Sequence, residues 1–90
     1  MRVVTIGRKG TDIVLNDSSN GVSRLHADLT ITDQGTLYLV DCGSSNGTFV
    51  HRQGTWHAIK QDYVTREEQV RFGSQYEIRV SDLLSRAPVE

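Results

Sequence analysis

The stretch DLTITDQGTLYLVD, residues 28–41, decides the fold class of this chain. It contains two runs in which apolar residues occupy every second position, namely Leu29, Ile31, Leu37 and Leu39. A period of two is typical of β-strands that bury one face. The runs are joined by Asp33-Gln34-Gly35, a polar connection in which the glycine can take a positive φ. The stretch therefore predicts a β-hairpin that packs on a core.

Short runs rich in β-branched and aromatic residues recur along the rest of the chain. Strands are expected over 2–6, 12–15, 28–33, 36–41, 48–50, 55–61, 63–65, 69–73 and 75–80. The last two would pair about Gly73-Ser74, with Val70, Phe72, Ile78 and Val80 facing inward, before one helical turn over 81–86 capped by Ser81. Turns at intervals of about 8–12 residues are typical of sandwiches. The sequence predicts an all-β fold, an antiparallel β-sandwich of short strands.

The composition of the chain argues against several classes of partner. The chain has 90 residues, enough for one domain, and a net charge of -1 with mixed signs. No basic stripe is present, so nucleic acid is not expected as a partner. The longest apolar run, Leu37 to Val40, has four residues, so this segment is not expected to insert into a membrane. The single Cys42 cannot form an intrachain disulfide, which favours a reducing compartment.

Three loops are more polar than turns require. They cover residues 7–12, 16–26 and 41–49. Their side chains are mostly hydrogen-bond donors, namely Arg8, Ser23, Arg24, Ser45 and Asn46. Arginine offers a planar fork that matches phosphate oxygens, and hydroxyl and amide groups add short, oriented bonds. Such a set suits a dianion, and a phosphorylated side chain supplies one.

Four motifs within these loops occur in an order and spacing that resemble one known family. They are IGR (6–8), DIVLND (12–17), VSRLHA (22–27) and DCGSSNGTF (41–49), and the closing RFGSQYEIRV (71–80) fits as well. The chain resembles the forkhead-associated (FHA) domain, which reads phosphothreonine peptides. The resemblance covers most of residues 3–80 and implies an FHA/SMAD-like sandwich over residues 1–86, with 87–90 as a tail that could begin a linker.

The resemblance also implies roles for individual residues. Arg8 would bind the phosphate, Ser23 would donate its hydroxyl to it, and Arg24 would add a backbone or guanidinium contact. Ser45 would reach the phosphate or the phosphoresidue, and Asn46 would hold the peptide main chain. Support of the site would come from Gly7, His26, Gly47 and Thr48, with Ser44 and Thr48 bracing the turn.

The implied function is phosphothreonine-dependent binding of a protein or peptide in Ser/Thr-kinase signalling. The kinase acts upstream on the partner, and this chain has no catalytic step and no cofactor. A cytoplasmic location follows from the composition, and the compact style of the chain suggests a bacterial origin. The loop after Asp17 is slightly longer than is common in the family. The preference for residues around the phosphothreonine is therefore the property that can least be inferred from the family.

Two further expectations concern the N-terminal edge of the sheet and the position of Trp56. The family has two further strands before the IGR motif, whereas here Met1 stands five residues before Ile6. Either the fold is a short variant that lacks these strands or the N-terminus was trimmed, and the sheet edge left there would need residues 2–6 or a partner to cover it. Trp56 is most simply a core residue, although an exposed tryptophan would serve a second interface.

Other classes of function fit the sequence less well. A scaffold with the same fold and phosphate-independent association is the alternative, and the joint presence of Arg8, Ser23 and Asn46 argues against it. Zinc is not expected, because His26, His51, His57 and Cys42 lack paired close spacing. A serine hydrolase would need a general base, and on a strand the spacing of Ser23 and His26 would put them on opposite faces.

Overall fold

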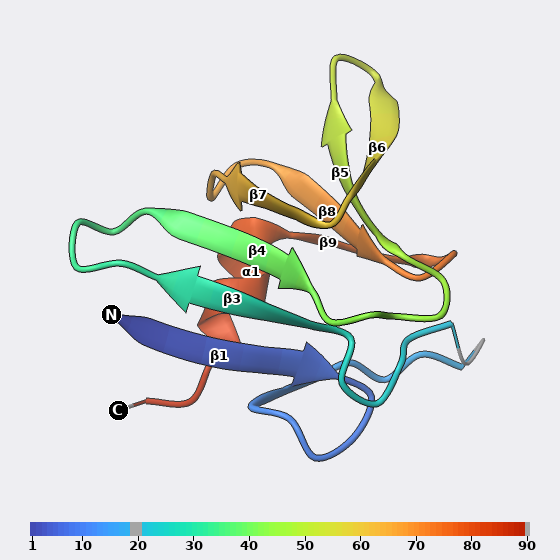
Figure 1. Cartoon of the computed structure of the whole chain (residues 1–90), viewed down its shortest axis with the longest axis horizontal. Coiled ribbons are helices and arrows are strands. Elements are labelled where there is room, and N and C mark those ends of the chain that lie inside the picture. The colour runs from blue at the N-terminus through green and yellow to red at the C-terminus, as the bar shows by residue number, and fades with distance from the viewer. Residues whose placement is uncertain (19–20, 90) are drawn as a thin grey trace.

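The structure is a computed structural model that describes residues 1–18 and 21–89. Its strands form two sheets (Figure 1). Sheet A has the order β2-β1-β3-β4-β7, and sheet B has the order β6-β5-β8-β9. The elements are β1 (Arg2–Gly7), β2 (Ile13–Val14), β3 (Ala27–Ile31), β4 (Leu37–Asp41), β5 (Thr48–Arg52), β6 (Thr55–Ile59), β7 (Gln61–Val64), β8 (Gln69–Phe72), β9 (Tyr76–Arg79) and α1 (Val80–Ser85). The all-β sandwich expected from the sequence is confirmed.

The hairpin of residues 28–41 forms as β3 and β4, in register from Ala27↔Asp41 to Ile31↔Leu37. Strand β3 ends at Ile31, two residues before the expected end, because Thr32 begins the turn. The Thr32 backbone bonds to Thr36 and Gly35 at 2.9 Å each, and Gly35 has a φ of 85°. Leu29 and Leu39 face each other in the core.

One core joins the inner faces of the two sheets and one side of α1. Its members, all at most 9% exposed, are Val4, Ile6, Ile13, Leu15, Val22, Ala27, Leu29, Leu37, Leu39, Val50, Val64, Val70, Phe72, Ile78, Val80 and Leu83. They include the four residues expected to face inward from the last two strands. Such burial removes most apolar side chains of the strands from water and is the main stabilising contribution.

A second strand covers the outer edge of β1 only at its end, at Ile6 and Gly7. Strand β1 lies between β3 and β2, and its pairing with β2 is parallel, at Ile6↔Ile13 and Gly7↔Val14. This pair departs from the expected antiparallel pattern. The loop after β1 turns back along the strand, and the Asp12 carboxylate accepts a hydrogen bond from the Thr5 backbone N–H at 3.0 Å. The segment after Asp12 therefore runs beside β1 in the same direction.

Three further expectations were wrong. The run 55–61 is not one strand, because β6 ends at Ile59 and the chain passes at Lys60 from sheet B to sheet A. Ser81 is not the helix cap, because α1 begins at Val80 after Arg79 and has no side-chain cap. Trp56 is half-buried and lies outside the core. No glycine or proline marks the crossing at Lys60 in the sequence.

The start of α1 is capped by a loop of the main chain. The backbone N–H of Val80 donates to the Glu68 carbonyl and that of Ser81 to the Arg66 carbonyl, both at 2.9 Å. These bonds satisfy N–H groups that a helix start otherwise leaves open. A Ser81 side-chain cap is therefore not needed. Within the described residues, no helix is long and apolar enough to cross a membrane.

Candidate functional site

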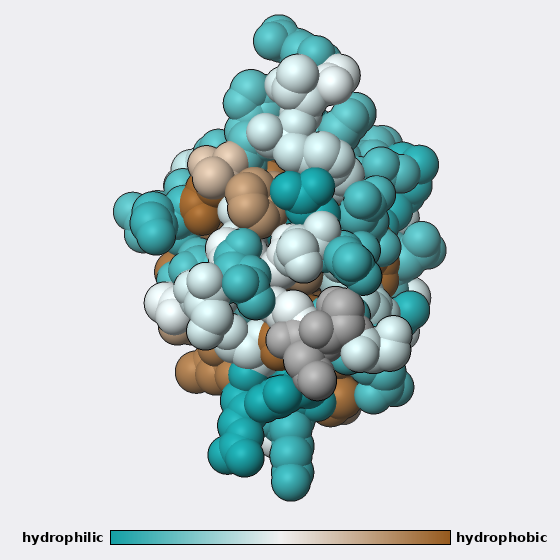
Figure 2. Space-filling model, turned by 90° about the vertical axis from the view of Figure 1, so that its right-hand side faces the viewer, coloured by the Kyte–Doolittle hydropathy of each residue, from teal (hydrophilic) through white to brown (hydrophobic). Residues whose placement is uncertain are grey.

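The three polar loops meet at one end of the sandwich, on the right in Figure 1 and away from the N-terminus. The backbone N–H of Arg8 donates to the Ser23 carbonyl at 3.0 Å, and the backbone N–H of Ser45 donates to the Ser23 hydroxyl at 3.1 Å. The loop of residues 8–12 and the loop of residues 42–47 are thus both bonded to Ser23. Figure 2 views this end, where hydrophilic and neutral residues predominate and hydrophobic ones show only as small separate areas.

Gly7 allows two of these loops to touch. A Cβ at Gly7 would lie 1.8 Å from the Arg24 carbonyl oxygen and 3.1 Å from that of Ser23. No side chain fits in this contact, so the glycine sets the distance between β1 and the Ser23 loop. As a result the side chains of Arg8 and Arg24 extend from adjacent stretches of backbone. Both are exposed, and neither guanidinium has a hydrogen-bond or ion-pair partner in the described part of the chain.

Ser23 is half-buried and uses both of its backbone groups. Its carbonyl accepts from Arg8, and its N–H donates to His26 Nδ1 at 3.0 Å. Its hydroxyl oxygen accepts from Ser45, but a hydroxyl also carries one proton to donate. Among the described residues no acceptor takes that proton. Ser23 is therefore held rigidly with a donor still available.

His26 is fully buried and joins two loops. Its Nδ1 accepts from the Ser23 N–H, so the other nitrogen, Nε2, carries the proton and donates to the Gly47 carbonyl at 2.8 Å. The ring also meets Phe72 edge-on, with centroids 5.5 Å apart. Burial lowers the pKa of His26, which the bond to Gly47 and the nearby Asp41 only partly oppose. The imidazole is neutral, and both of its nitrogens are occupied.

The prediction that Ser23 and His26 would lie on opposite faces of a strand is wrong. Ser23 and His26 do not lie on a strand, and they do contact each other. The contact uses the Ser23 backbone rather than its hydroxyl, so the imidazole is not placed to remove the hydroxyl proton. No hydroxyl of Ser23 or Ser45 is bonded to a base within residues 1–18 and 21–89.

Asp41 braces the turn that follows β4. Its carboxylate accepts from the Ser44 hydroxyl, from the Ser44 backbone N–H at 3.2 Å and from the Thr48 hydroxyl at 2.7 Å. Burial alone would raise the pKa of Asp41, but these bonds outweigh it and lower the pKa. No role of Asp41 was predicted from the sequence. An aspartate immediately before a serine-rich turn was the available signal, since such side chains bond to nearby backbone.

Gly47 closes the same turn. It has a φ of 90°, and its carbonyl accepts from both His26 and the backbone N–H of Gly73. Gly73 in turn has no room for a side chain, because a Cβ there would lie 2.3 Å from the Gly21 carbonyl oxygen. The sequence predicted Gly73 only as a turn residue and gave no role to Gly21. Here they bring the end of the β8–β9 hairpin against the site.

Ser45 and Asn46 are exposed at the tip of the turn. The Asn46 side-chain nitrogen donates to the Gly21 carbonyl at 3.1 Å, which uses one of its two protons. The second proton and the side-chain oxygen have no partner among the described residues, nor does the Ser45 hydroxyl. The turn thus presents a hydroxyl and an amide beside Ser23. With Arg8 and Arg24, this end of the fold offers donors suited to an anion with several acceptor oxygens.

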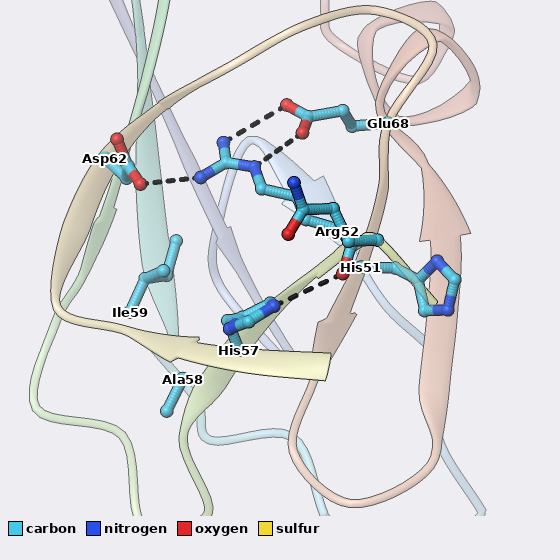
Figure 3. A pocket seen from close by; sticks show the side chains of 8 residues that line it. His51, Arg52, His57, Ala58, Ile59, Asp62 and Glu68 are labelled. Carbon is cyan, nitrogen blue, oxygen red and sulfur yellow. Dashed lines mark hydrogen bonds and ion pairs between the residues drawn. The ribbon is translucent and has the colours of Figure 1, made fainter. Parts of the chain in front are cut away.

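A hollow lies elsewhere, beside the β5–β6 hairpin, and has a volume of about 680 Å³ (Figure 3). Its arginine, Arg52, donates to Glu68 at 2.6 Å and to Asp62 at 2.8 Å. Hydrogen bonds from Arg52 lower the pKa of both carboxyl groups, and both raise the pKa of Arg52. The guanidinium charge is already balanced, so this hollow is not an anion site. No group of three potential metal ligands occurs among the described residues.

Comparison with known proteins gives a family. The sequence model of the FHA domain matches residues 4–85. A search of curated proteins finds no match. Among solved structures, the FHA domain of FhaA, complexed with the intracellular domain of Rv3910, is 26% identical with a TM-score of 0.68, and the match covers 86% of this chain and 78% of that one.

Two other structures are similar to this chain. The FHA domain of CT664 from Chlamydia trachomatis is 28% identical with a TM-score of 0.66, over 80% of this chain and 68% of that one. The N-terminal FHA domain of Rad53p from S. cerevisiae, in complex with a phosphothreonine peptide, is 27% identical with a TM-score of 0.61. That match covers 80% of this chain and 56% of the yeast domain's chain.

Proposed function

The chain belongs to the FHA domain family, and from this premise we propose that it binds proteins or peptides through a phosphothreonine. FHA domains are binding modules, and the proposal assigns this chain no catalytic step and no cofactor. The partner is a protein phosphorylated by an upstream Ser/Thr kinase. Binding is then switched on by the kinase and off by a phosphatase that acts on the partner.

One observation carries the proposal. The three loops are bonded together around Ser23, while the Arg8 guanidinium and the hydroxyl protons of Ser23 and Ser45 have no partner among the described residues. Donors held in place without an acceptor are prepared for a ligand that supplies acceptors. The similar yeast domain is bound to a phosphothreonine peptide, which identifies the class of ligand to test.

The proposed mechanism is charge-assisted hydrogen bonding at a preformed site. Arg8 binds phosphate oxygens with its guanidinium, and Ser23 donates its hydroxyl proton to another. Arg24 and Ser45 add contacts to the phosphate or to the phosphoresidue, and Asn46 uses its free side-chain groups on the peptide main chain. Gly7, His26, Gly47 and Thr48 keep the loops in place. The threonine methyl group occupies a small pocket. The single Cys42 supports a reducing compartment, so we place the event in the cytoplasm.

The experiment is a fluorescence anisotropy titration with three degenerate peptide libraries. One is centred on phosphothreonine, one on phosphoserine and one on unmodified threonine. The proposal expects binding to the phosphothreonine library alone. Equal binding to all three libraries, or binding to none, would contradict it and favour a phosphate-independent scaffold.

A further inference from the structure

Arg71 is held between two aromatic rings on the outer face of sheet B. This face, formed by Phe49, His51, Trp56, Ala58 and Arg71, alternates along β5 and β8 with the core residues Val50, Val70 and Phe72. The Arg71 guanidinium carbon lies 4.4 Å from the Phe49 ring centroid and 4.9 Å from that of Trp56. His51 meets Trp56 edge-on at 4.9 Å and supports that ring. The rings therefore fix the plane of the guanidinium.

The Arg71 guanidinium has no hydrogen-bond acceptor among residues 1–18 and 21–89. Its Nε is buried without a hydrogen-bond partner, the one such side-chain atom among the described residues. Glu77 stands directly opposite Arg71 in the β8–β9 pairing, yet no ion pair joins the two. A surface arginine beside a glutamate would ordinarily pair with it. Stacking on Phe49 and Trp56 instead leaves the planar fork of Arg71 oriented and uncompensated.

This arginine adjoins the proposed phosphopeptide site. A Cβ at Gly47 would lie 3.0 Å from the tip of the Phe49 ring, so the ring that holds Arg71 packs against the turn that presents Ser45 and Asn46. An extended peptide rises about 3.3 Å per residue, so a few residues are enough to reach from this turn to the outer face of sheet B. One peptide can therefore contact both places.

We propose that Arg71 binds the carboxylate of an aspartate or glutamate that flanks the phosphothreonine in the partner. The inference rests on the proposed function and adds a preference for acidic sequence to it. A carboxylate fits the free edge of a guanidinium with two parallel hydrogen bonds, and an arginine stacked on rings loses little freedom when it forms them. Trp56 then has the role of a second contact beside Arg71, which its half-buried position outside the core allows.

Substitution of Glu77 provides a test in which the preference for an acidic peptide should rise rather than fall. Glu77 is exposed and faces Arg71 from the next strand, so its charge repels an incoming carboxylate. If Arg71 binds an acidic residue of the peptide, Glu77→Gln strengthens the preference for acidic peptides while Arg71 is unchanged. If Arg71 only covers the aromatic rings, neither its charge nor that of Glu77 affects peptide choice.

The experiment compares three versions of one peptide by anisotropy: phosphothreonine flanked by glutamates, phosphothreonine flanked by glutamines, and unmodified threonine flanked by glutamines. We expect the wild-type chain to bind the glutamate version about three- to tenfold more tightly than the glutamine version. Arg71→Met keeps the aliphatic packing and is expected to bring this ratio to about one, with unchanged affinity for the glutamine phosphopeptide. Glu77→Gln is expected to raise the ratio by about two- to threefold.

The outcomes separate the two claims. If the glutamine phosphopeptide binds no better than the unmodified peptide, the proposed function fails and this inference fails with it. If phosphorylation is required but the ratio is near one in the wild type, or is unchanged in Arg71→Met and Glu77→Gln, only the role of Arg71 is overturned. Should Arg71→Met not fold, a ratio that does not rise in Glu77→Gln overturns that role by itself.

Discussion

The hydroxyl oxygen of Ser23 accepts a hydrogen bond from the backbone N–H of Ser45 at 3.1 Å, although the two residues stand 22 positions apart. This bond ties the loop after β2 to the loop after β4. It leaves the Ser23 hydroxyl proton without an acceptor among the described residues, and the neighbouring Arg8 and Arg24 are exposed. The Ser23 hydroxyl thus holds two loops of the site together and also provides one of its hydrogen-bond donors.

Ser23→Ala is expected to weaken phosphothreonine-peptide binding by about tenfold or more, because a hydrogen bond to a charged group and the link to Ser45 are both lost. The stability loss should be smaller, about 1 kcal/mol, since one neutral bond in a half-buried place is removed. Peptide titration and urea unfolding measure the two effects. Unchanged affinity in a folded Ser23→Ala chain would refute the role of the hydroxyl.

Ser81→Ala is the matched serine control and a prediction of its own. Loss of a true helix cap costs about 1 kcal/mol. Since the first turn of α1 is capped by the Glu68 and Arg66 carbonyls, this change should alter the free energy of unfolding by less than about 0.5 kcal/mol. Peptide affinity should not change. A loss near 1 kcal/mol would show that Ser81 caps the helix after all.

Gly7→Ala is expected to destabilise the fold by at least about 3 kcal/mol, because the new Cβ would meet the Arg24 carbonyl oxygen at 1.8 Å and β1 or the loop must move. Gly35→Ala is the control. Gly35 has a φ of 85° and open space around it, so only backbone strain of about 1–2 kcal/mol applies. Urea unfolding compares the two. Equal losses would mean that the contact at Gly7 does not restrict the fold.

Stability should fall as the pH drops below about 6.5, the ordinary pKa of histidine. The pKa of His26 is lower in the folded state, so over this range the unfolded chain binds more protons and stability rises with pH. One such group gives a slope of at most about 1.4 kcal/mol per pH unit, which ends once the pH passes below the folded-state pKa. The lowered pKa of Asp41 acts only below its ordinary 3.8 and does not overlap.

The measurement is urea unfolding between pH 7 and pH 5 for the wild type and for His26→Gln. The variant keeps a polar side chain without a titrating ring, so it should be less stable at pH 7 but show a shallower pH dependence. An equally steep dependence in the variant would exclude His26 as its source.

Local patterns in the sequence predicted most of the strands and the residues of the three polar loops. The alternation in residues 28–41 predicted β3 and β4, and the motif order placed Arg8, Ser23 and Ser45 in loops that do meet. The family resemblance is confirmed by the match over residues 4–85.

What the sequence did not predict depends on distances between remote segments. The crossing at Lys60 takes place without a glycine or proline, and the α1 cap comes from carbonyls of a loop that precedes β8. The contact that requires Gly7 involves Arg24, which is not a sequence neighbour. Stacking of Arg71 on Phe49 and Trp56 joins three strands, so no short motif encodes it.

The most direct test of the central claim is titration of one phosphothreonine peptide into the wild type, Arg8→Ala and Arg66→Ala. Both arginines are exposed, but Arg66 lies in the loop before β8, away from the three polar loops. We predict that Arg8→Ala loses at least about a hundredfold in affinity with unchanged unfolding, since a charge-assisted pair to the phosphate is removed. Arg66→Ala should bind like the wild type. Retained affinity in a folded Arg8→Ala chain would contradict phosphate recognition at this site.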